Sequence, residues 1–155
     1  MSTPLLILRP GMPVAMCSDH AGYELKEAIK QHLQAVGITT EDFGTDSEES
    51  CDYPDFAHPC ATSVETGKAY PAIAICGTGN GMSMSLNKHR GIRAALCWDV
   101  ELARLARAHN NANVLVLPAR FINVNKALAI VETFFSTPFD GGRHERRVEK
   151  IDSQD

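Results

Sequence analysis

Residues 70–83 read Tyr-Pro-Ala-Ile-Ala-Ile-Cys-Gly-Thr-Gly-Asn-Gly-Met-Ser, and this stretch decides the fold of the chain. The apolar run at 73–75 is typical of a strand that is buried on both faces of a parallel sheet. Cys76 follows at the predicted strand end, and Gly77, Gly79 and Gly81 allow a sharp turn into a helix that reaches Lys88. Such a turn points several backbone N–H groups at one place, where the helix dipole adds positive potential. The stretch therefore predicts a cradle for a negatively charged oxygen, with a thiol at its rim.

Composition narrows the class of protein. With 155 residues and 44% hydrophobic content, one globular domain is expected, and a net charge of −4 argues against a nucleic-acid surface. The apolar residues 5–8 are followed at once by Arg9 and Pro10, so they are too short for a signal sequence or a membrane span. The five cysteines form no C-x-x-C pair, so we expect no disulfide framework, no metal site and a reducing, cytoplasmic setting.

Strand and helix patterns alternate along the chain. Predicted strands cover residues 14–17, 39–43, 73–75, 92–97 and 114–117. Predicted helices begin after residue 22, after 55, at the glycine turn, at 99 or 100, at 123 and at 143. This alternation predicts an α/β fold, a three-layer α/β/α sandwich with a five-stranded parallel sheet of the flavodoxin or Rossmann kind. We expect residues 1–12 to be a frayed extension, 13–151 to form the single α/β domain, and 152–155 to be a tail.

Four polar residues fall directly after predicted strands, and ligands of open parallel sheets bind beyond the carboxyl ends of the strands. Asp19 and His20 follow the first strand, Cys76 follows the third, and Arg120 follows the fifth. We therefore expect these four side chains to meet at one edge of the sheet.

Each candidate also has an interpretation without catalysis. Cys76 at a helix start is a possible base or nucleophile, or simply a small buried side chain. Asp19 fits a helix N-cap, and His109 fits the end of a helix, where the dipole favours histidine. Arg143 and Arg147 lie one helical turn apart and suit a phosphate group, but they equally suit a solvated helix face.

The glycine run also has a nucleotide-binding interpretation. Gly77 and Gly79 begin the G-x-G-x-x-G pattern, and Asp99 lies near the place of a ribose-binding acid. However, the third glycine is Gly81, and the position that the pattern requires holds Met82. The turn also follows the third predicted strand, whereas the dinucleotide motif usually follows the first. A nucleotide-binding regulatory module stays a weaker alternative.

Six segments together resemble the type B ribose-5-phosphate isomerases, a family that includes the galactose-6-phosphate isomerase subunits. They cover residues 18–22, 52–54, 76–81, 91–94, 109–114 and 141–148, in the family's order. The resemblance implies a flavodoxin-like sheet, a homodimer or tetramer with active sites shared between subunits, and no metal or organic cofactor. The chain departs from the family pattern at Pro118, before Arg120, and at Trp98, which is bulkier than expected.

The resemblance also implies roles for individual residues. Cys76 corresponds to the proton-abstracting base, Thr78 supports the thiol, His109 opens the furanose ring as an acid, and Asp19 helps to move protons between oxygens. The other implied contacts are the enediolate-binding N–H groups of Gly77, Thr78, Gly79, Asn80 and Gly81, the sugar contacts Tyr53 and Asn110, and the phosphate contacts His20, Arg120, Arg143 and Arg147.

These expectations converge on an aldose–ketose isomerase of the pentose phosphate pathway, which interconverts D-ribose 5-phosphate and D-ribulose 5-phosphate through an enediolate. The alternative substrates are galactose or allose 6-phosphate, or a tetrose phosphate. We expect no nucleic-acid or membrane partner. The sequence leaves open the preferred sugar, the choice between dimer and tetramer, the subunit that supplies each arginine, and the role of residues 1–12.

Overall fold

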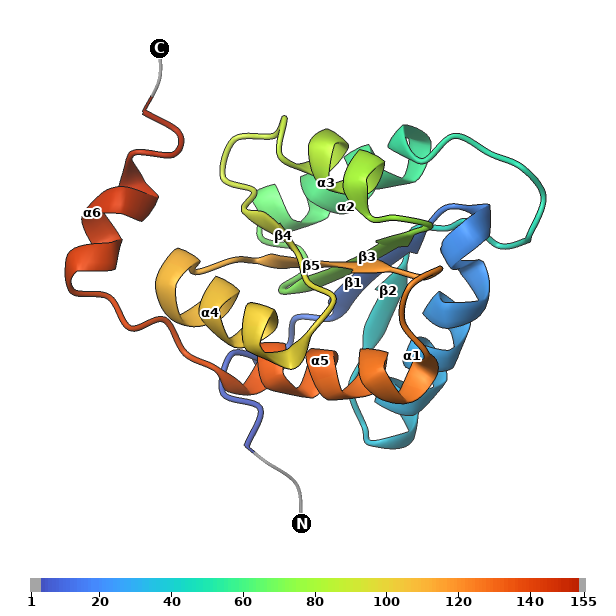
Figure 1. The fold of residues 1–155 in the computed structure, drawn as a ribbon, viewed down its shortest axis with the longest axis horizontal. Coiled ribbons are helices and arrows are strands. Elements are labelled where there is room, and N and C mark those ends of the chain that lie inside the picture. The colour runs from blue at the N-terminus through green and yellow to red at the C-terminus, as the bar shows by residue number, and fades with distance from the viewer. Residues whose placement is uncertain (1–3, 154–155) are drawn as a thin grey trace.

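The computed structural model describes residues 4–153, and its centre is a parallel sheet of five strands in the order β2-β1-β3-β5-β4 (Figure 1). The predicted class and strand number are confirmed. The two edge strands are shorter than predicted, because each has only one neighbour to pair with. The strands are β1 (Val14–Ser18), β2 (Thr40–Asp42), β3 (Ala72–Cys76), β4 (Ala94–Leu96) and β5 (Val114–Pro118).

Helices cover both faces of this sheet (Figure 1). Helices α1, α4 and α5 lie on one face, α2 and α3 lie on the other, and α6 packs against the outer side of α4. Among residues 4–153, none of the helices combines the length and the apolar character needed to cross a membrane. The helices are the short 3-10 turn η1 (His20–Gly22), α1 (Tyr23–Ala35), α2 (Pro54–Glu65), α3 (Asn80–Leu86), α4 (Val100–Asn110), α5 (Val124–Ser136) and α6 (Arg143–Glu149).

Strand β3 divides the interior into two apolar clusters, because alternate side chains of a strand point to opposite faces. Ile73 and Ile75 belong to the cluster under α1, α4 and α5, which also holds Phe134. Ala74 and Cys76 belong to the smaller cluster under α2 and α3. Small side chains on this second face let α2 and α3 approach the sheet closely. The Cys76 thiol is therefore directed toward the α2–α3 side.

The strand order differs from the flavodoxin order 2-1-3-4-5 by an exchange of the last two strands. The chain leaves β3 through α3 to the edge strand β4 and returns through α4 to β5. The connection after β1 runs over one face of the sheet, and the connection after β3 runs over the other. A crevice therefore opens between the carboxyl ends of β1 and β3, where ligands of such sheets bind.

The prediction of a frayed N-terminal extension is wrong for residues 4–12. Ile7 is buried, and its N–H group donates a 3.0 Å hydrogen bond to the Phe135 carbonyl oxygen. The Arg9 guanidinium lies 3.6 Å from the centre of the Tyr70 ring. Apolar side chains in an irregular segment bury area as effectively as those in a helix, which a search for regular elements overlooks. Residues 1–3 of the predicted extension lie outside the described part.

Candidate active site

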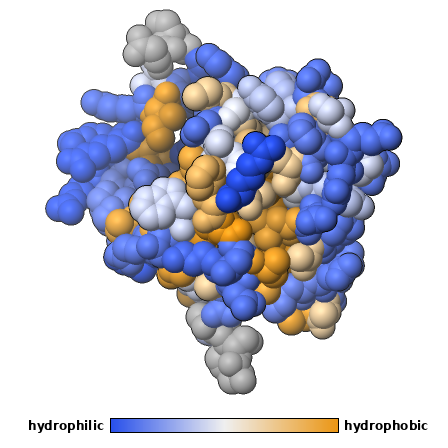
Figure 2. All heavy atoms as spheres, turned by 45° about the vertical axis from the view of Figure 1, so that its right-hand side comes forward, coloured by the Kyte–Doolittle hydropathy of each residue, from blue (hydrophilic) through white to orange (hydrophobic). Residues whose placement is uncertain are grey.

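A pocket of about 290 Å³ opens at the carboxyl ends of β1, β3 and β5. In Figure 2 the side toward which the strands run comes forward, and an apolar area lies there within a frame of hydrophilic side chains. The pocket unites residues that are far apart in the sequence, and all but one of its lining residues were predicted site residues. It is lined by Asp19, His20, Ala21, Tyr53, Cys76, Gly77, Thr78, Gly81 and Arg120.

Cys76 occupies the end of β3 at the floor of this pocket and is 4% exposed. Its backbone is fixed from the neighbouring strand, since the Ala119 N–H donates to the Cys76 carbonyl oxygen at 2.9 Å. The next bond of the same ladder joins the Arg120 N–H to the Gly77 carbonyl oxygen at 3.0 Å. Pro118, the departure noted in the sequence, ends β5 without taking Arg120 away from the pocket.

Glycine is required at two places in the turn because other side chains occupy the space of a Cβ atom. A Cβ on Gly81 would lie 2.4 Å from Cζ of Tyr53, so the Tyr53 ring rests directly on the helix start. A Cβ on Gly79 would lie 2.3 Å from a Leu96 methyl carbon, and the φ of Gly79 is +83°. The side chain of Arg120 covers Gly77 in the same way, with Nη1 3.2 Å from the Cβ position.

The turn does not offer all five predicted N–H groups to a ligand. The Asn80 N–H donates to the Thr78 hydroxyl at 3.2 Å, so the Thr78 side chain caps its own turn. Gly79 and Asn80 are also absent from the pocket lining, whereas Gly77, Thr78 and Gly81 are part of it. The observed bond of the Thr78 hydroxyl thus goes to a backbone amide, and support of the thiol by Thr78 stays a prediction.

Asp19 combines both interpretations that the sequence left open. Its Oδ1 accepts a 3.1 Å hydrogen bond from the Gly22 N–H, which makes it the N-cap of η1. The side chain nevertheless lines the pocket beside Cys76. A Cβ on Gly22 would lie 2.7 Å from the Ile75 carbonyl oxygen, so η1 packs directly on the end of β3.

His20 is held by Cys51, which lies in the loop before α2. The backbone N–H of Cys51 donates to Nδ1 of His20 at 3.3 Å. In the neutral ring this bond assigns the proton to Nε2, the other nitrogen, which is then a hydrogen-bond donor. No sequence signal marked Cys51, because 31 residues of chain separate it from His20.

The remaining predicted site residues lie at the opposite edge of the sheet. His109 and Asn110 end α4, and Arg143 and Arg147 belong to α6, on the left of Figure 1, whereas the glycine turn is on the right. The Asp140 N–H donates to the Ala108 carbonyl oxygen at 2.9 Å and so fixes the loop before α6 to the end of α4. Within one chain, the structure therefore separates the predicted site into two groups.

The rings of His109 and His144 stack within this second group, with centroids 4.2 Å apart and planes inclined by 13°. Partial burial lowers the pKa of His144, and the nearby positive charges of His109 and Arg143 lower it further. Together with Asp140 these histidines form the one cluster in residues 4–153 whose ligand atoms, within 4.8 Å of each other, suit a cation. However, ligand atoms around a tetrahedral zinc ion lie roughly 3.4 Å apart, and nearly parallel rings do not aim their nitrogens at one point. The arrangement suits ring stacking better than metal binding.

Known proteins match this chain over most of its length. The family model described as Ribose/Galactose Isomerase matches residues 14–151. The ribose-5-phosphate isomerase B of Escherichia coli is 41% identical over 138 residues, which cover 89% of this chain and 93% of that protein. The crystal structure of the Thermotoga maritima ribose 5-phosphate isomerase has 57% identity and a TM-score of 0.91, with 92% of this chain and 99% of that chain covered. A Mycoplasma genitalium ribose-5-phosphate isomerase B with bound ribulose-5-phosphate has 39% identity and a TM-score of 0.88, with 94% and 97% covered.

Proposed function

Because the chain belongs to the ribose/galactose isomerase family, we propose that it interconverts D-ribose 5-phosphate and D-ribulose 5-phosphate through an enediolate. The observation that carries the proposal is the pocket in which the Cys76 thiol, the glycine turn and the Arg120 guanidinium meet. The Mycoplasma genitalium relative, whose structure holds ribulose-5-phosphate, supports the choice of sugar. The nucleotide-binding alternative is based on the glycine run at Gly77 and Gly79, and family membership supports a different role for that run.

The proposed chemistry begins at Cys76. From ribose 5-phosphate, the thiolate removes the proton on C2, beside the C1 carbonyl group, and electron density moves onto the carbonyl oxygen. The N–H groups of the glycine turn stabilise this oxygen, and the thiol then returns the proton to C1. Asp19, at the same pocket wall, moves a proton between the oxygens on C1 and C2. A positioned base contributes about 10²–10⁴-fold to the rate, and an oxyanion donor about 10²–10³-fold.

The proposed orientation of the sugar follows from the charged residues around the thiol. Arg120 covers Gly77 at one side of the pocket, and His20 lines the same pocket with Nε2 free of the Cys51 bond. These two side chains suit the phosphate end of the substrate. Tyr53, which lies on Gly81, suits the sugar hydroxyl groups. Binding of the phosphate then places the reacting carbons next to the sulfur.

The second group of residues enters this proposal through a second subunit. His109, Asn110, Arg143 and Arg147 cannot reach the pocket of their own chain, because they lie beyond the opposite ends of the strands. Helix α6 has no buried residue, so its arginines are free to face another molecule. A homodimer or tetramer that sets α6 of one chain against the Cys76 pocket of another would complete the site, with His109 as the ring-opening acid.

A longer phosphosugar is the second candidate substrate. A neighbouring hollow of about 370 Å³ shares Thr78 with the pocket and is lined by Trp98, Pro118 and Phe121. Trp98 is 56% exposed and Phe121 is 71% exposed, so both rings are accessible to a ligand. This hollow offers space for a sixth carbon beyond that needed by a pentose.

The test compares kcat/KM for tetrose 4-phosphate, ribose 5-phosphate and allose or galactose 6-phosphate. We expect the five-carbon substrate to be preferred, and a preference for a hexose phosphate would assign the enzyme to the longer sugar. In parallel, Cys76→Ala should lower kcat by about 10²–10⁴-fold while ribose 5-phosphate still binds. Cys97→Ala is the control, because burial raises the pKa of Cys97 to about 12 and keeps it a thiol. Near-normal turnover of Cys76→Ala would exclude Cys76 as the base.

A further inference from the structure

A basic pocket lies at the other edge of the sheet, where the N-terminal segment passes over Tyr70. It has a volume of about 320 Å³ and shares no residue with the Cys76 pocket. Its polar side chains are Arg9, Tyr70, Arg107 and Asn111, and apolar residues that include Phe139 form the rest of the wall. No acidic residue belongs to this lining. Arg9 precedes the family match, which starts at residue 14, so this part of the wall lies outside the matched residues.

Arg107 is a buried cation at the base of this pocket, with 3% of its surface exposed. Its Nε–H donates to the Thr137 carbonyl oxygen at 3.1 Å. Its Nη1 donates to Oδ1 of Asn111 at 2.9 Å and to the Ala112 carbonyl oxygen at 2.6 Å. These acceptors are neutral, and they fix the guanidinium without balancing its charge. A buried charge without a counter-charge is costly, so an anion beside Arg107 would be stabilising.

Two further guanidinium groups increase this positive potential. Arg9 stacks on the Tyr70 ring, and Arg93 donates from Nε to the Asn111 carbonyl oxygen at 2.9 Å. Burial lowers the pKa of Arg107, and the charges of Arg93 and Arg9 act in the same direction, while Tyr70 opposes them. Asp152 acts on Arg93 from outside the pocket, and Asp140 directly follows the lining residue Phe139 in the chain.

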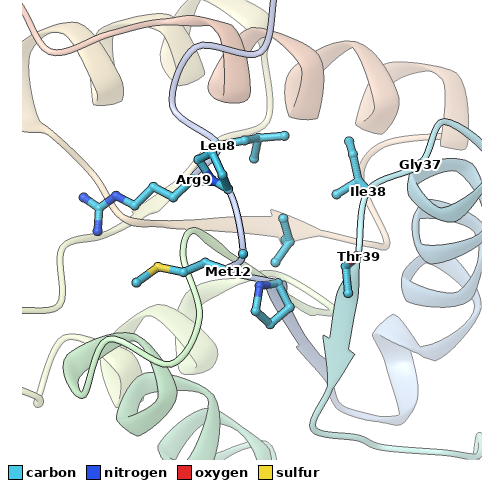
Figure 3. A pocket seen from close by; sticks show the side chains of 10 residues that line it. Leu8, Arg9, Met12, Gly37, Ile38 and Thr39 are labelled. Atoms are coloured by element: carbon cyan, nitrogen blue, oxygen red, sulfur yellow. The ribbon is translucent and has the colours of Figure 1, made fainter.

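The direction of Arg9 distinguishes this pocket from its larger neighbour. A hollow of about 390 Å³ lies between residues 8–14 and residues 37–39 (Figure 3). Figure 3 shows that the Arg9 side chain extends away from Ile38 and Thr39. The only cation of that larger hollow therefore turns toward Tyr70 and Arg107. Positive charge from two separate segments is concentrated in the smaller, basic pocket.

We propose that the basic pocket binds the phosphate group of a small phosphorylated molecule, between Arg9 and Arg107. Guanidinium groups bind phosphate oxygens through charge-assisted, often paired hydrogen bonds. The Tyr70 hydroxyl and the Asn111 amide supply further polar contacts, and Phe139 supplies an apolar surface for the remainder of the ligand. This site is separate from the proposed catalytic pocket and does not depend on the function proposed for it.

The test follows backbone amide signals of the ¹⁵N-labelled full-length protein by NMR during titration with inorganic phosphate and, separately, with adenosine monophosphate. We expect saturable shifts at Ile7, Leu8 and Tyr70. These shifts are followed apart from any at Gly77, Thr78 and Asn110, which report the proposed shared catalytic site. Shifts that appear only at Gly77, Thr78 and Asn110 would overturn the proposal and leave the proposed function untouched.

The matched variants are Arg9→Gln and Arg104→Gln. Arg9 is exposed, so its replacement leaves the fold intact, and we expect phosphate to bind at the basic pocket about tenfold more weakly, since one charge-assisted contact is lost. Arg104 lies on α4 one turn before Arg107 and pairs with Glu101 at 2.6 Å, so its loss should not change binding. If phosphate binding weakened equally in both variants, the cause would be the loss of one positive charge anywhere on the protein, and the proposed site would be overturned. If adenosine monophosphate binds more tightly than phosphate, the pocket is a site for organic phosphates. If phosphate binds and adenosine monophosphate does not, the pocket is a site for the free ion, and the proposal of a phosphorylated molecule is overturned.

Discussion

The two edges of the sheet are built in different ways. At the carboxyl edge, backbone bonds and packed rings fix several lining residues: Asp19 caps η1, the Cys51 N–H holds His20, and Tyr53 lies on Gly81. At the amino edge, α6 has no buried residue and packs against α4. The first edge resembles a finished pocket, and the second resembles a surface that supplies side chains to another molecule. In the proposed enzyme, the two edges of different chains together form one active site.

The largest effect is expected from mixing two inactive variants, one for each edge. Cys76→Ala removes the proposed base and His109→Asn removes the proposed acid, so each variant alone should be nearly inactive. After dissociation and random reassociation, about half of the dimers are mixed, and each mixed dimer has one intact shared site. Activity should therefore rise to about a quarter of the wild-type value.

The matched control mixes Cys76→Ala with Asp19→Asn, which alter the same edge and cannot complement each other. An inactive Cys76–His109 mixture, with reassociation verified by mass spectrometry, would show that both edges serve the same chain. A fully active His109→Asn variant on its own would show that His109 has no role.

Gly81→Ala should disrupt the carboxyl edge alone. The new methyl group would lie 2.4 Å from Cζ of Tyr53 and would push the ring off the start of α3. Misplacement of a contact by about 1 Å can cost about 10²-fold, so we expect kcat/KM to fall by one to two orders of magnitude with roughly the same oligomeric state. In a Tyr53→Ala background the additional loss should be small, which a double-mutant cycle measures. A full additional loss would mean that the clash with Tyr53 is not the cause.

Asp42→Asn tests the support beneath the carboxyl edge. The fully buried Lys26 Nζ lies 2.5 Å from Oδ2 of Asp42, and Oδ1 accepts from the Gly44 N–H at 2.9 Å. We expect the free energy of unfolding to fall by about 1–2 kcal/mol, since Glu27 still pairs with Lys26 and Asp42 is partly solvated. Chemical denaturation at pH 7 measures this loss, and Glu41→Gln, an exposed neighbour, is the control.

The same pair predicts an acid dependence of stability. Burial alone would raise the pKa of Asp42, but the hydrogen bonds from Lys26 and Lys30 outweigh it and hold the pKa below the ordinary value. The stabilisation is therefore present at neutral pH, and it is lost as the pH falls below about 4 toward the folded-state pKa. The wild type should lose stability in this range more steeply than Asp42→Asn. Parallel curves would exclude Asp42 as a source of the acid sensitivity.

The smallest effect is expected at the amino edge. His144 should titrate below the ordinary histidine pKa, because partial burial and then the charges of His109 and Arg143 disfavour its protonated form. Arg143→Gln removes one of these charges, so NMR titration of the ring protons should give a higher pKa for His144. If the pKa of His144 were unchanged in Arg143→Gln, then burial and His109, and not Arg143, would account for the lowered value. Glu149→Gln, on the last turn of α6, serves as the control for a general effect of charge on this helix.

The sequence was a good guide where structure depends on neighbouring residues. The run before Cys76 and the glycines after it predicted β3, the turn and the start of α3, because strand burial and positive φ are local properties. The helix caps at Asp19 and Asn123 follow from the same local rules. Edge strands were predicted too long, since the end of a strand depends on its partner. Residues 4–12 were misjudged because an irregular segment has no periodic pattern.

The sequence by itself determined the order of the elements, the parallel sheet and the placing of Cys76 at a strand end, because backbone preferences and side-chain periodicity act over a few residues. Only the tertiary structure decided which distant residues touch: Tyr53 on Gly81, the Cys51 amide on His20, and Arg9 on Tyr70 beside Arg107. It also set His109 and Arg143 at the opposite edge from Cys76. Such contacts depend on how whole elements pack, and packing sums many weak interactions between parts of the chain that no local pattern connects.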